Sequence, residues 1–434
     1  MPENTVMPEH DRARLAGWIR ENAATLDTLD PDAPLDDLEP LRDIIGDARV
    51  VALGEGCHFV REFTTARRRL LRFLAERCGF TALAFEFGFA EGPALDRWLR
   101  GEGGEDDLAA LGGTTASGVT GELARWLRRY NATAARPLRF LGIDVPQAGG
   151  TLRPALEPVA GYLREVDPDA LPFVERALEI SDRFAGGSVA AAAPVWAGLD
   201  RADQDALTAA LGRVVLRARA LEPRYVERGG RERYETALRR IEAAWHADYM
   251  VGALNGVFTG TGLPLDTSVR DHFMAGSLLW HLDRAEPGER VVLAAHNNHI
   301  QKTAVHYDGE LFGYVMGHYL AGALGGDYRA IAMTHTADSV PEMNPDGSGE
   351  VGFSLVDTAA APARPGSVEG ALLDAGLGSA ITLTGLRHAP RAADGDALLG
   401  GIRSQSSEMV TPVPEAFDAV LTVPSATTHF TTAF

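Results

Sequence analysis

The stretch RVVALGEGCHFVREF, residues 49–63, decides the fold expected for this chain. Its apolar run Val50–Leu53 is typical of a buried strand, and a polar turn and then a helical pattern follow it. The turn carries a carboxylate, Glu55, and an imidazole, His58. Ligands of open α/β sheets bind beyond the carboxyl ends of the strands, so this turn is a candidate catalytic position.

Further apolar runs recur along the chain with helical segments between them. This rhythm predicts an α/β fold with a mostly parallel sheet flanked by helices. Residues 338–365, rich in Asp, Gly, Ser and Pro, are expected to be irregular. The expected strands are Val50–Leu53, Leu83–Phe87, Phe140–Ile143, Val291–Ala295 and Ile331–Met333, with Ala380–Leu383 and Ala419–Val423 as candidates to extend the sheet.

The segment from Leu152 to about Leu254 has helical spacing throughout, which predicts an all-helical insertion that forms a lid or cleft wall. The predicted organisation therefore has four parts. They are an N-terminal helix and linker (1–40), a first part of the α/β core (41–151), the helical insertion (152–255) and a second part of the core (256–434).

Composition and charge argue against several classes of protein. The formal net charge of −19 argues against a nucleic-acid partner, because few basic groups remain to neutralise phosphates. No apolar run approaches the ~20 residues of a membrane span, so no membrane association is expected. The charged N-terminus does not resemble a signal peptide, and the only cysteines are Cys57 and Cys78. Both features predict a cytoplasmic protein.

Acidic and imidazole side chains stand at the ends of four successive predicted strands. Because the carboxyl ends of parallel strands meet at one edge of a sheet, we expect these side chains to form a single site. They are Glu55 and His58 after the first run, Glu86 in the second, Asp144 at the end of the third, and His296 and His299 after the fourth.

One arginine is expected to be buried beside these acids. Arg67 falls inside the apolar stripe of the helix that follows His58, so it needs a buried anion, for which Glu55 and Glu86 are the candidates. The neighbouring arginines lie off the stripe and are expected in solvent: Arg68, Arg69 and Arg72.

These residue types are compatible with more than one chemistry. A histidine, with an ordinary pKa near ~6.5, suits a general base in hydrolysis. The imidazoles of HNNH also have a spacing that suits zinc, although no HExxH motif is present. A metal-dependent hydrolase built on His58, Glu86, His296 and His299 therefore stays open. A glycosidase that uses Glu55 and Glu86 leaves the histidines without a role. A non-catalytic small-molecule binding protein is the remaining alternative.

The motifs GEGCHFVREF, FEFGFAEG, GIDVP, AHNNHIQKT and MGHYLAGALGGDYRAI, in this order, resemble those of the erythromycin esterases, and the broad-specificity type B members are the most similar. The resemblance implies hydrolysis of the macrolide lactone ester by a His-activated water, which inactivates the antibiotic. It implies no metal and no cofactor, and it leaves a macrolide and water as the expected partners.

The resemblance also implies roles for individual residues. His58 corresponds to the general base and Glu55 to its acidic companion, and Cys57 stands where family members carry Ser or Thr. The other residues carried over as catalytic are Glu86, Arg67, His296 and His299. The donor to the oxyanion stays open among Arg67, His296 and His299. The residues expected to bind the macrocycle are Asp144, Trp245, Tyr249 and Phe258.

Overall fold

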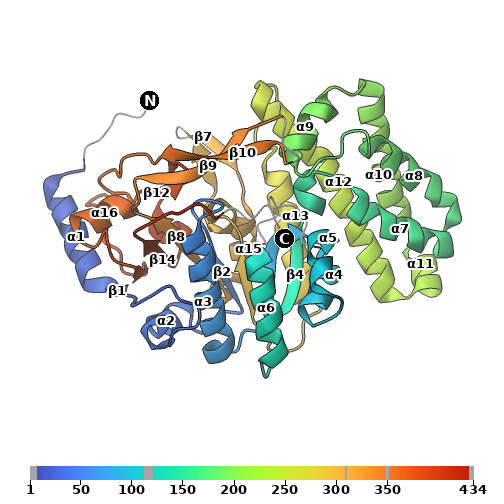
Figure 1. Ribbon diagram of the computed structural model, residues 1–434. Helices are drawn as coiled ribbons and strands as arrows, with labels where there is room; N and C mark the ends of the chain where they lie inside the picture. The colour runs from blue at the N-terminus through green and yellow to red at the C-terminus, as the bar shows by residue number, and fades with distance from the viewer. Residues whose placement is uncertain (1–6, 112–120, 308–309, 348–350, 430–434) are drawn as a thin grey trace.

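The computed structural model describes residues 7–111, 121–307, 310–347 and 351–429 (Figure 1). The described residues form a central eight-stranded sheet. Its strands are β1 Ala23–Thr25, β2 Val50–Leu53, β3 Ala82–Gly88, β4 Arg139–Asp144, β5 Val291–Ala294, β8 Tyr328–His335, β11 Thr382–Gly385 and β14 Ala419–Val423. They are ordered β1-β11-β14-β8-β2-β5-β3-β4. The strands from β14 to β4 are parallel, and β11 and β1 add antiparallel pairs at one edge. The predicted α/β class is confirmed.

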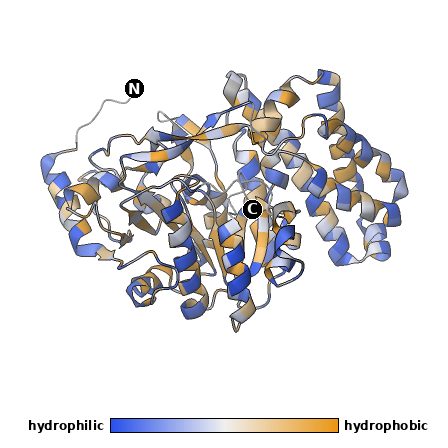
Figure 2. Cartoon of the chain, viewed as in Figure 1, coloured by the Kyte–Doolittle hydropathy of each residue, from blue (hydrophilic) through white to orange (hydrophobic). Residues whose placement is uncertain are grey.

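Helices cover both faces of the sheet, as expected when parallel strands are apolar on both sides. Val51 and Leu53 belong to the core under one helical layer, whereas Val50 and Ala52 belong to the core under the other. Figure 2 shows this hydrophobic sheet between amphipathic helices. The first layer comprises α2 Pro40–Ile45, α3 Arg61–Cys78, α4 Gly92–Leu99 and α6 Gly121–Thr133, and the second comprises α1 Glu9–Asn22, α13 Ser268–Leu282, α15 Met316–Leu324 and α16 Val368–Asp374.

The chain between β4 and α13 forms a helical unit with a hydrophobic core of its own, at the right of Figure 1. Its helices are α7 Arg153–Val166, α8 Leu171–Ser181, α9 Val189–Ala197, α10 Arg201–Ala220, α11 Glu222–Gly229 and α12 Arg231–Thr259. The helical character of residues 152–255 is thus as predicted, and the division of the chain into four parts stays a prediction. Within the described ranges, no helix is both long enough and apolar enough to cross a bilayer.

The prediction of an irregular segment at residues 338–365 is wrong. The strands β9 Ser339–Pro345 and β10 Phe353–Ala359 pair there as an antiparallel ribbon. Pro341 and Pro345 suggested a break, but both strands of a two-stranded ribbon are edges, where proline is tolerated. The ribbon reaches α9, where the Ser188 hydroxyl donates to the Val351 carbonyl at 2.6 Å (Figure 1).

The remaining elements are short. Two further hairpins pair β6 Val305–Tyr307 with β7 Glu310–Gly313, and β12 Gly401–Ser404 with β13 Ser407–Val410. The short α-helices are α5 Leu108–Leu111, α14 Asn297–Ile300 and α17 Val413–Ala416.

The expectation that Arg68 and Arg69 lie in solvent is also wrong. Arg69 is 2% exposed and donates to Asp37 at 2.6 Å, and Arg68 pairs with Glu122. The segment before α2 covers Arg69, which donates to the Pro34 carbonyl, whereas Glu122 and Trp126 of α6 cover Arg68. The apolar stripe of α3 could not predict this burial, because the covering residues come from other segments of the chain.

Candidate active site

The turn after β2 brings an acid, a base and a buried cation together. Glu55 accepts from Nδ1 of His58 at 2.7 Å through one oxygen and from Nη2 of Arg67 at 2.6 Å through the other. Arg67 is 2% exposed and lies over the ring of Phe85. Of the two anions considered for Arg67, the partner is therefore Glu55.

The contact between Glu55 and His58 shifts the pKa of both groups. Burial opposes ionisation of Glu55, but Arg67 and His58 lower the pKa of this carboxyl to about 2. Burial also opposes a charge on His58, yet the hydrogen bond to Glu55 and the charges of Glu55 and Glu86 together outweigh it, and the pKa of His58 is raised. Because an ionised Glu55 accepts the proton on Nδ1, Nε2 of neutral His58 carries the lone pair.

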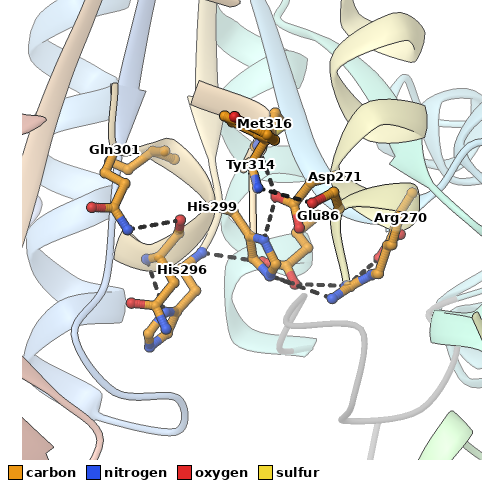
Figure 3. Close-up of polar contacts among 12 residues, drawn as sticks. Glu86, Arg270, Asp271, His296, His299, Gln301, Tyr314 and Met316 are labelled. Atoms are coloured by element: carbon orange, nitrogen blue, oxygen red, sulfur yellow. Dashed lines mark hydrogen bonds and ion pairs between the residues drawn. The ribbon is translucent and has the colours of Figure 1, made fainter. Parts of the chain in front are cut away.

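A second ionic cluster lies one strand along. Glu86 sits in an irregularity of the β3–β4 pairing between Phe85 and Gly88, the kind of local distortion that redirects a side chain. Arg270, from α13, donates to Glu86 at 2.8 Å and to both oxygens of Asp144, at 3.0 and 2.5 Å (Figure 3). Asp144 is 2% exposed and is paired with Arg270. Its predicted role in substrate binding stays a prediction.

His299 completes this second cluster. Its Nδ1 lies 2.8 Å from Asp271 and its Nε2 lies 3.5 Å from Glu86 (Figure 3). Burial opposes a charge on the ring, but Asp271 and Glu86 raise the pKa of His299 to about 8. In turn, His299 and Arg270 hold the pKa of Glu86 well below its ordinary value despite burial. The cluster therefore holds two cations among three carboxylates near pH 7.

His296 lies between the two clusters and stays neutral. Its ring centroid is 4.9 Å from that of His58. Burial, together with the charges of His58 and His299, lowers the pKa of His296 to about 3. Its Nδ1 accepts from the Asn298 N–H at 3.2 Å, and its Nε2 lies 3.2 Å from the Gly56 carbonyl. Both ring nitrogens thus face the backbone, and the ring serves to pack against His58.

The glycines of GEG leave room for a buried amide that joins the strands. The side chain of Asn297 donates to the Met333 carbonyl at 2.9 Å, and its backbone N–H donates to the Glu55 carbonyl at 2.8 Å. A Cβ on Gly54 would overlap the Oδ1 atom of Asn297. Only glycine fits at this position beside the turn that carries Glu55 and His58.

Gly54→Ala is therefore expected to lower the free energy of unfolding by at least about 1–3 kcal/mol, the usual cost of overpacking a tight core. Urea denaturation measures the change. The matched control is Gly212→Ala in α10, where an added Cβ meets nothing within 4 Å. That variant is expected to gain about 0.5–1 kcal/mol of helix propensity. Equal stability of the two variants would contradict this account.

A cavity of about 210 Å³ opens in front of the base. His58, Glu86 and Arg270 line its polar side. Its apolar lining comes from distant elements: Phe59 of the turn after β2, Val189 of α9, Met250 of α12, and Met343 and Phe353 of the β9–β10 ribbon. The helical unit and the ribbon therefore both wall the candidate active site.

Two of the aromatic residues expected to wall this cleft, Trp245 and Tyr249, lie elsewhere. Trp245 and Tyr249 line a separate cavity of about 710 Å³ between α9, α10 and α12. The structure does not bring them to His58, and their predicted role in binding substrate stays a prediction. Phe258 belongs to α12, but its side chain lies outside the described part of the chain.

The donor set does not resemble a metal centre. Among the described residues, no group of three or more His, Cys, Asp or Glu side chains is arranged to hold a metal ion. The ring nitrogens of His296 face the backbone, and those of His299 face Asp271, Glu86 and Arg270. The prediction that no metal is needed is left to the chelation experiment below.

A sequence profile of one family, described as erythromycin esterase, matches residues 75–426. The chain belongs to the erythromycin esterase family. It is 35% identical to erythromycin esterase type II of Escherichia coli, over 94% of this chain and 97% of the relative. It is also 35% identical to the type I enzyme of the same organism, over 90% of this chain and 94% of the relative.

A solved structure of the family has the same fold. It is a mutant of the erythromycin esterase EreC in its open conformation, with a TM-score of 0.87 and 32% sequence identity. The match covers 95% of this chain and 99% of that one. The fold described above is therefore also the fold of this solved erythromycin esterase.

Sequence reasoning missed two residues of the second cluster, Arg270 and Asp271. Both lie at the start of α13, where charged residues are ordinarily explained as caps and dipole partners. The signal was present, because Asp271 precedes Met274 and Leu278 by three and seven positions and so lies on the buried stripe. Asp271, like Arg67, is therefore a charged residue on the apolar stripe of its helix.

Proposed function

We propose that this chain hydrolyses the lactone ester of macrolides related to erythromycin, with His58 as the base that activates water. The observation that carries the proposal is the position of Glu55, which holds Nδ1 of His58 and is itself held by Arg67. This leaves Nε2 as the basic nitrogen of a residue that lines the cavity. Family membership supplies the substrate class.

The proposed reaction begins with transfer of a water proton to Nε2 of His58. The resulting hydroxide adds to the lactone carbonyl carbon, and the carbonyl oxygen becomes an oxyanion. When the ester C–O bond breaks, the leaving alkoxide takes the proton back from His58. The product is a linear hydroxy acid that contains one more water than the substrate. While His58 holds the proton, Glu55 stabilises its imidazolium form.

Arg270 is the best placed donor to the oxyanion. It lines the cavity beside His58, and its pKa is raised, so it stays charged throughout. His296 has both ring nitrogens directed at the backbone, and Arg67, although it also lines the cavity, donates to Glu55. A fixed guanidinium in a site shielded from water stabilises a developing negative charge strongly. We therefore add Arg270 to the candidates.

The cavity accommodates part of a macrolide. Pockets that enclose a whole drug-sized ligand have volumes of about 300–1,000 Å³, larger than the 210 Å³ in front of His58. We propose that the ester-bearing edge of the macrocycle enters this cavity. Phe59, Met250 and Phe353 then contact its alkyl groups.

Two other chemistries fit these contacts less well. A two-carboxylate glycosidase needs Glu55 as a nucleophile or acid, but His58 and Arg67 occupy both of its oxygens. A metal-dependent hydrolase needs free imidazole nitrogens, and His296 directs both of its own at the backbone.

Mass spectrometry of erythromycin incubated with the protein tests the proposal. The expected product is erythromycin with the added mass of one water, formed at the same rate with and without a chelator. Release of a sugar would favour the glycosidase, and a rate abolished by chelator and restored by zinc would favour the metal enzyme. Unchanged erythromycin after long incubation would contradict catalysis and favour a binding protein.

We further propose that the chain acts in the cytoplasm. The two cysteines, Cys57 and Cys78, are both free thiols in the structure. Free thiols are typical of a reducing compartment.

A further inference from the structure

The turn between β12 and β13 contains a residue in an unusual conformation. Gln405 has a φ of 53°, in the left-handed region that residues with a side chain seldom adopt. Glycine would adopt this conformation without strain. A glutamine at such a position therefore suggests that its side chain makes contacts that offset the backbone strain.

Gln405 contacts the catalytic turn at two points. Its backbone N–H donates to the Gly56 carbonyl at 2.6 Å, the carbonyl that also lies 3.2 Å from Nε2 of His296. Its side-chain Oε1 accepts from the backbone N–H of His58 at 3.1 Å. The peptide groups on both sides of Cys57 are thus held from a hairpin near the C-terminus.

The other end of the same amide reaches the ribbon that walls the cavity. Nε2 of Gln405 donates to Glu342 of β9 at 3.1 Å, and the next N–H, of Ser406, donates to the other oxygen of Glu342 at 2.9 Å. Glu342 directly precedes Met343, which lines the cavity. One glutamine side chain therefore joins the base to a wall of the substrate cavity.

We propose that Gln405 is a positioning residue for the base. It holds the turn so that His58 stays on Glu55 with Nε2 directed at the substrate, and it fixes the distance between that turn and the β9–β10 ribbon. The inference rests on the proposed role of His58. The acid, base and pocket wall are then aligned by a residue that does not line the cavity.

The test is Gln405→Gly, which removes both side-chain hydrogen bonds and relieves the left-handed backbone. With erythromycin as substrate, kcat is expected to fall about 10- to 100-fold, the effect of small misplacements of a catalytic group. KM should change little, and Tm should stay equal to or rise above that of the parent. Unchanged kcat, or a loss of kcat that follows a loss of folded protein, would overturn the inference.

A pH profile separates positioning from simple support of the fold. His58 faces Glu55, Glu86, His296 and His299. Burial lowers the pKa of His58, whereas its hydrogen bond to Glu55 raises it. If Gln405→Gly loosens that bond, the pKa of His58 falls and the acid limb of kcat/KM moves to lower pH. An acid limb at the parent's position would contradict the proposal.

Two further variants sharpen the result. Gln405→Glu keeps an acceptor for the His58 N–H but repels Glu342, so it should retain more kcat than Gln405→Gly. The control is Ser407→Ala, an exposed position at the start of β13 that should behave as the parent. If His58→Ala is fully active, the proposed function fails. If His58→Ala is inactive and Gln405→Gly has the parental rate, only this inference fails.

Discussion

His58→Ala is expected to lower kcat/KM for erythromycin by about 10²–10⁴-fold, the usual contribution of a general base. The imidazole accepts the water proton and returns it to the leaving alkoxide, and no neighbouring group replaces it. Glu55 is bonded to Arg67, and both nitrogens of His296 face the backbone. Steady-state kinetics measures the loss.

Loss of structure must be separated from loss of chemistry in that experiment. His58 is partly exposed to the cavity, so its truncation should leave Tm close to that of the parent. The matched control is His388→Ala, an exposed histidine outside the site, which should keep the parental kcat/KM. Parental kcat/KM in His58→Ala would remove this residue from the mechanism.

Arg270→Ala is expected to lower the free energy of unfolding by about 3–5 kcal/mol, the cost of leaving buried charges unpaired. Arg270 is the partner shared by Glu86 and Asp144, whose side chains are 13% and 3% exposed. Without it, two carboxylates lie together beside the cavity with only His299 close to one of them. Urea denaturation measures the change, and kcat should fall as well because the oxyanion loses its donor.

The pH dependence of that destabilisation has a definite sign. Pairing lowers the pKa of Glu86 below its ordinary value of 4.5, so the pair stabilises the parent above that pH and the benefit fades as pH falls. The gap in stability between parent and Arg270→Ala should therefore be constant near neutral pH and shrink as the pH falls below about 4.5. The control is Arg231→Ala, whose pair with Glu222 is exposed, so that little or no change in stability is expected at any pH. A gap that widened as the pH fell would contradict the assignment.

The sheet could be predicted because its strands are buried on both faces and read as continuous apolar runs. Val50–Leu53 is such a run, and the predicted strand has the bounds of β2. The edge strand Ala23–Thr25 was missed because it has three residues, and its exposure is set by pairing with β11 rather than by its own pattern. The β9–β10 ribbon was missed because Pro341 and Pro345 are residues that usually indicate a loop rather than a strand.

The candidate site could be predicted where side chains directly follow strands, as Glu55 and His58 do. Arg67 could be predicted because it is a charged residue on the apolar face of a helix. Arg270 and Gln405 come from a helix start and a hairpin turn, and nothing in their own neighbourhood indicates which strand they meet. Their partners lie far away along the chain, so only the tertiary fold reveals them.

The position of β2 in the sheet has a consequence for how the molecule is made. This strand, translated early, lies between β5 and β8, which come from residues 291–294 and 328–335. Closing such long loops carries a large entropic cost, so this topology is expected to fold slowly and late. The turn that carries Glu55 and His58 also needs two contacts from late in the chain. Gln405 donates its N–H to the Gly56 carbonyl, and His429 donates its N–H to the Phe59 carbonyl. A nascent chain that stops before β14 therefore has every proposed catalytic residue but lacks the contact of His429 with this turn.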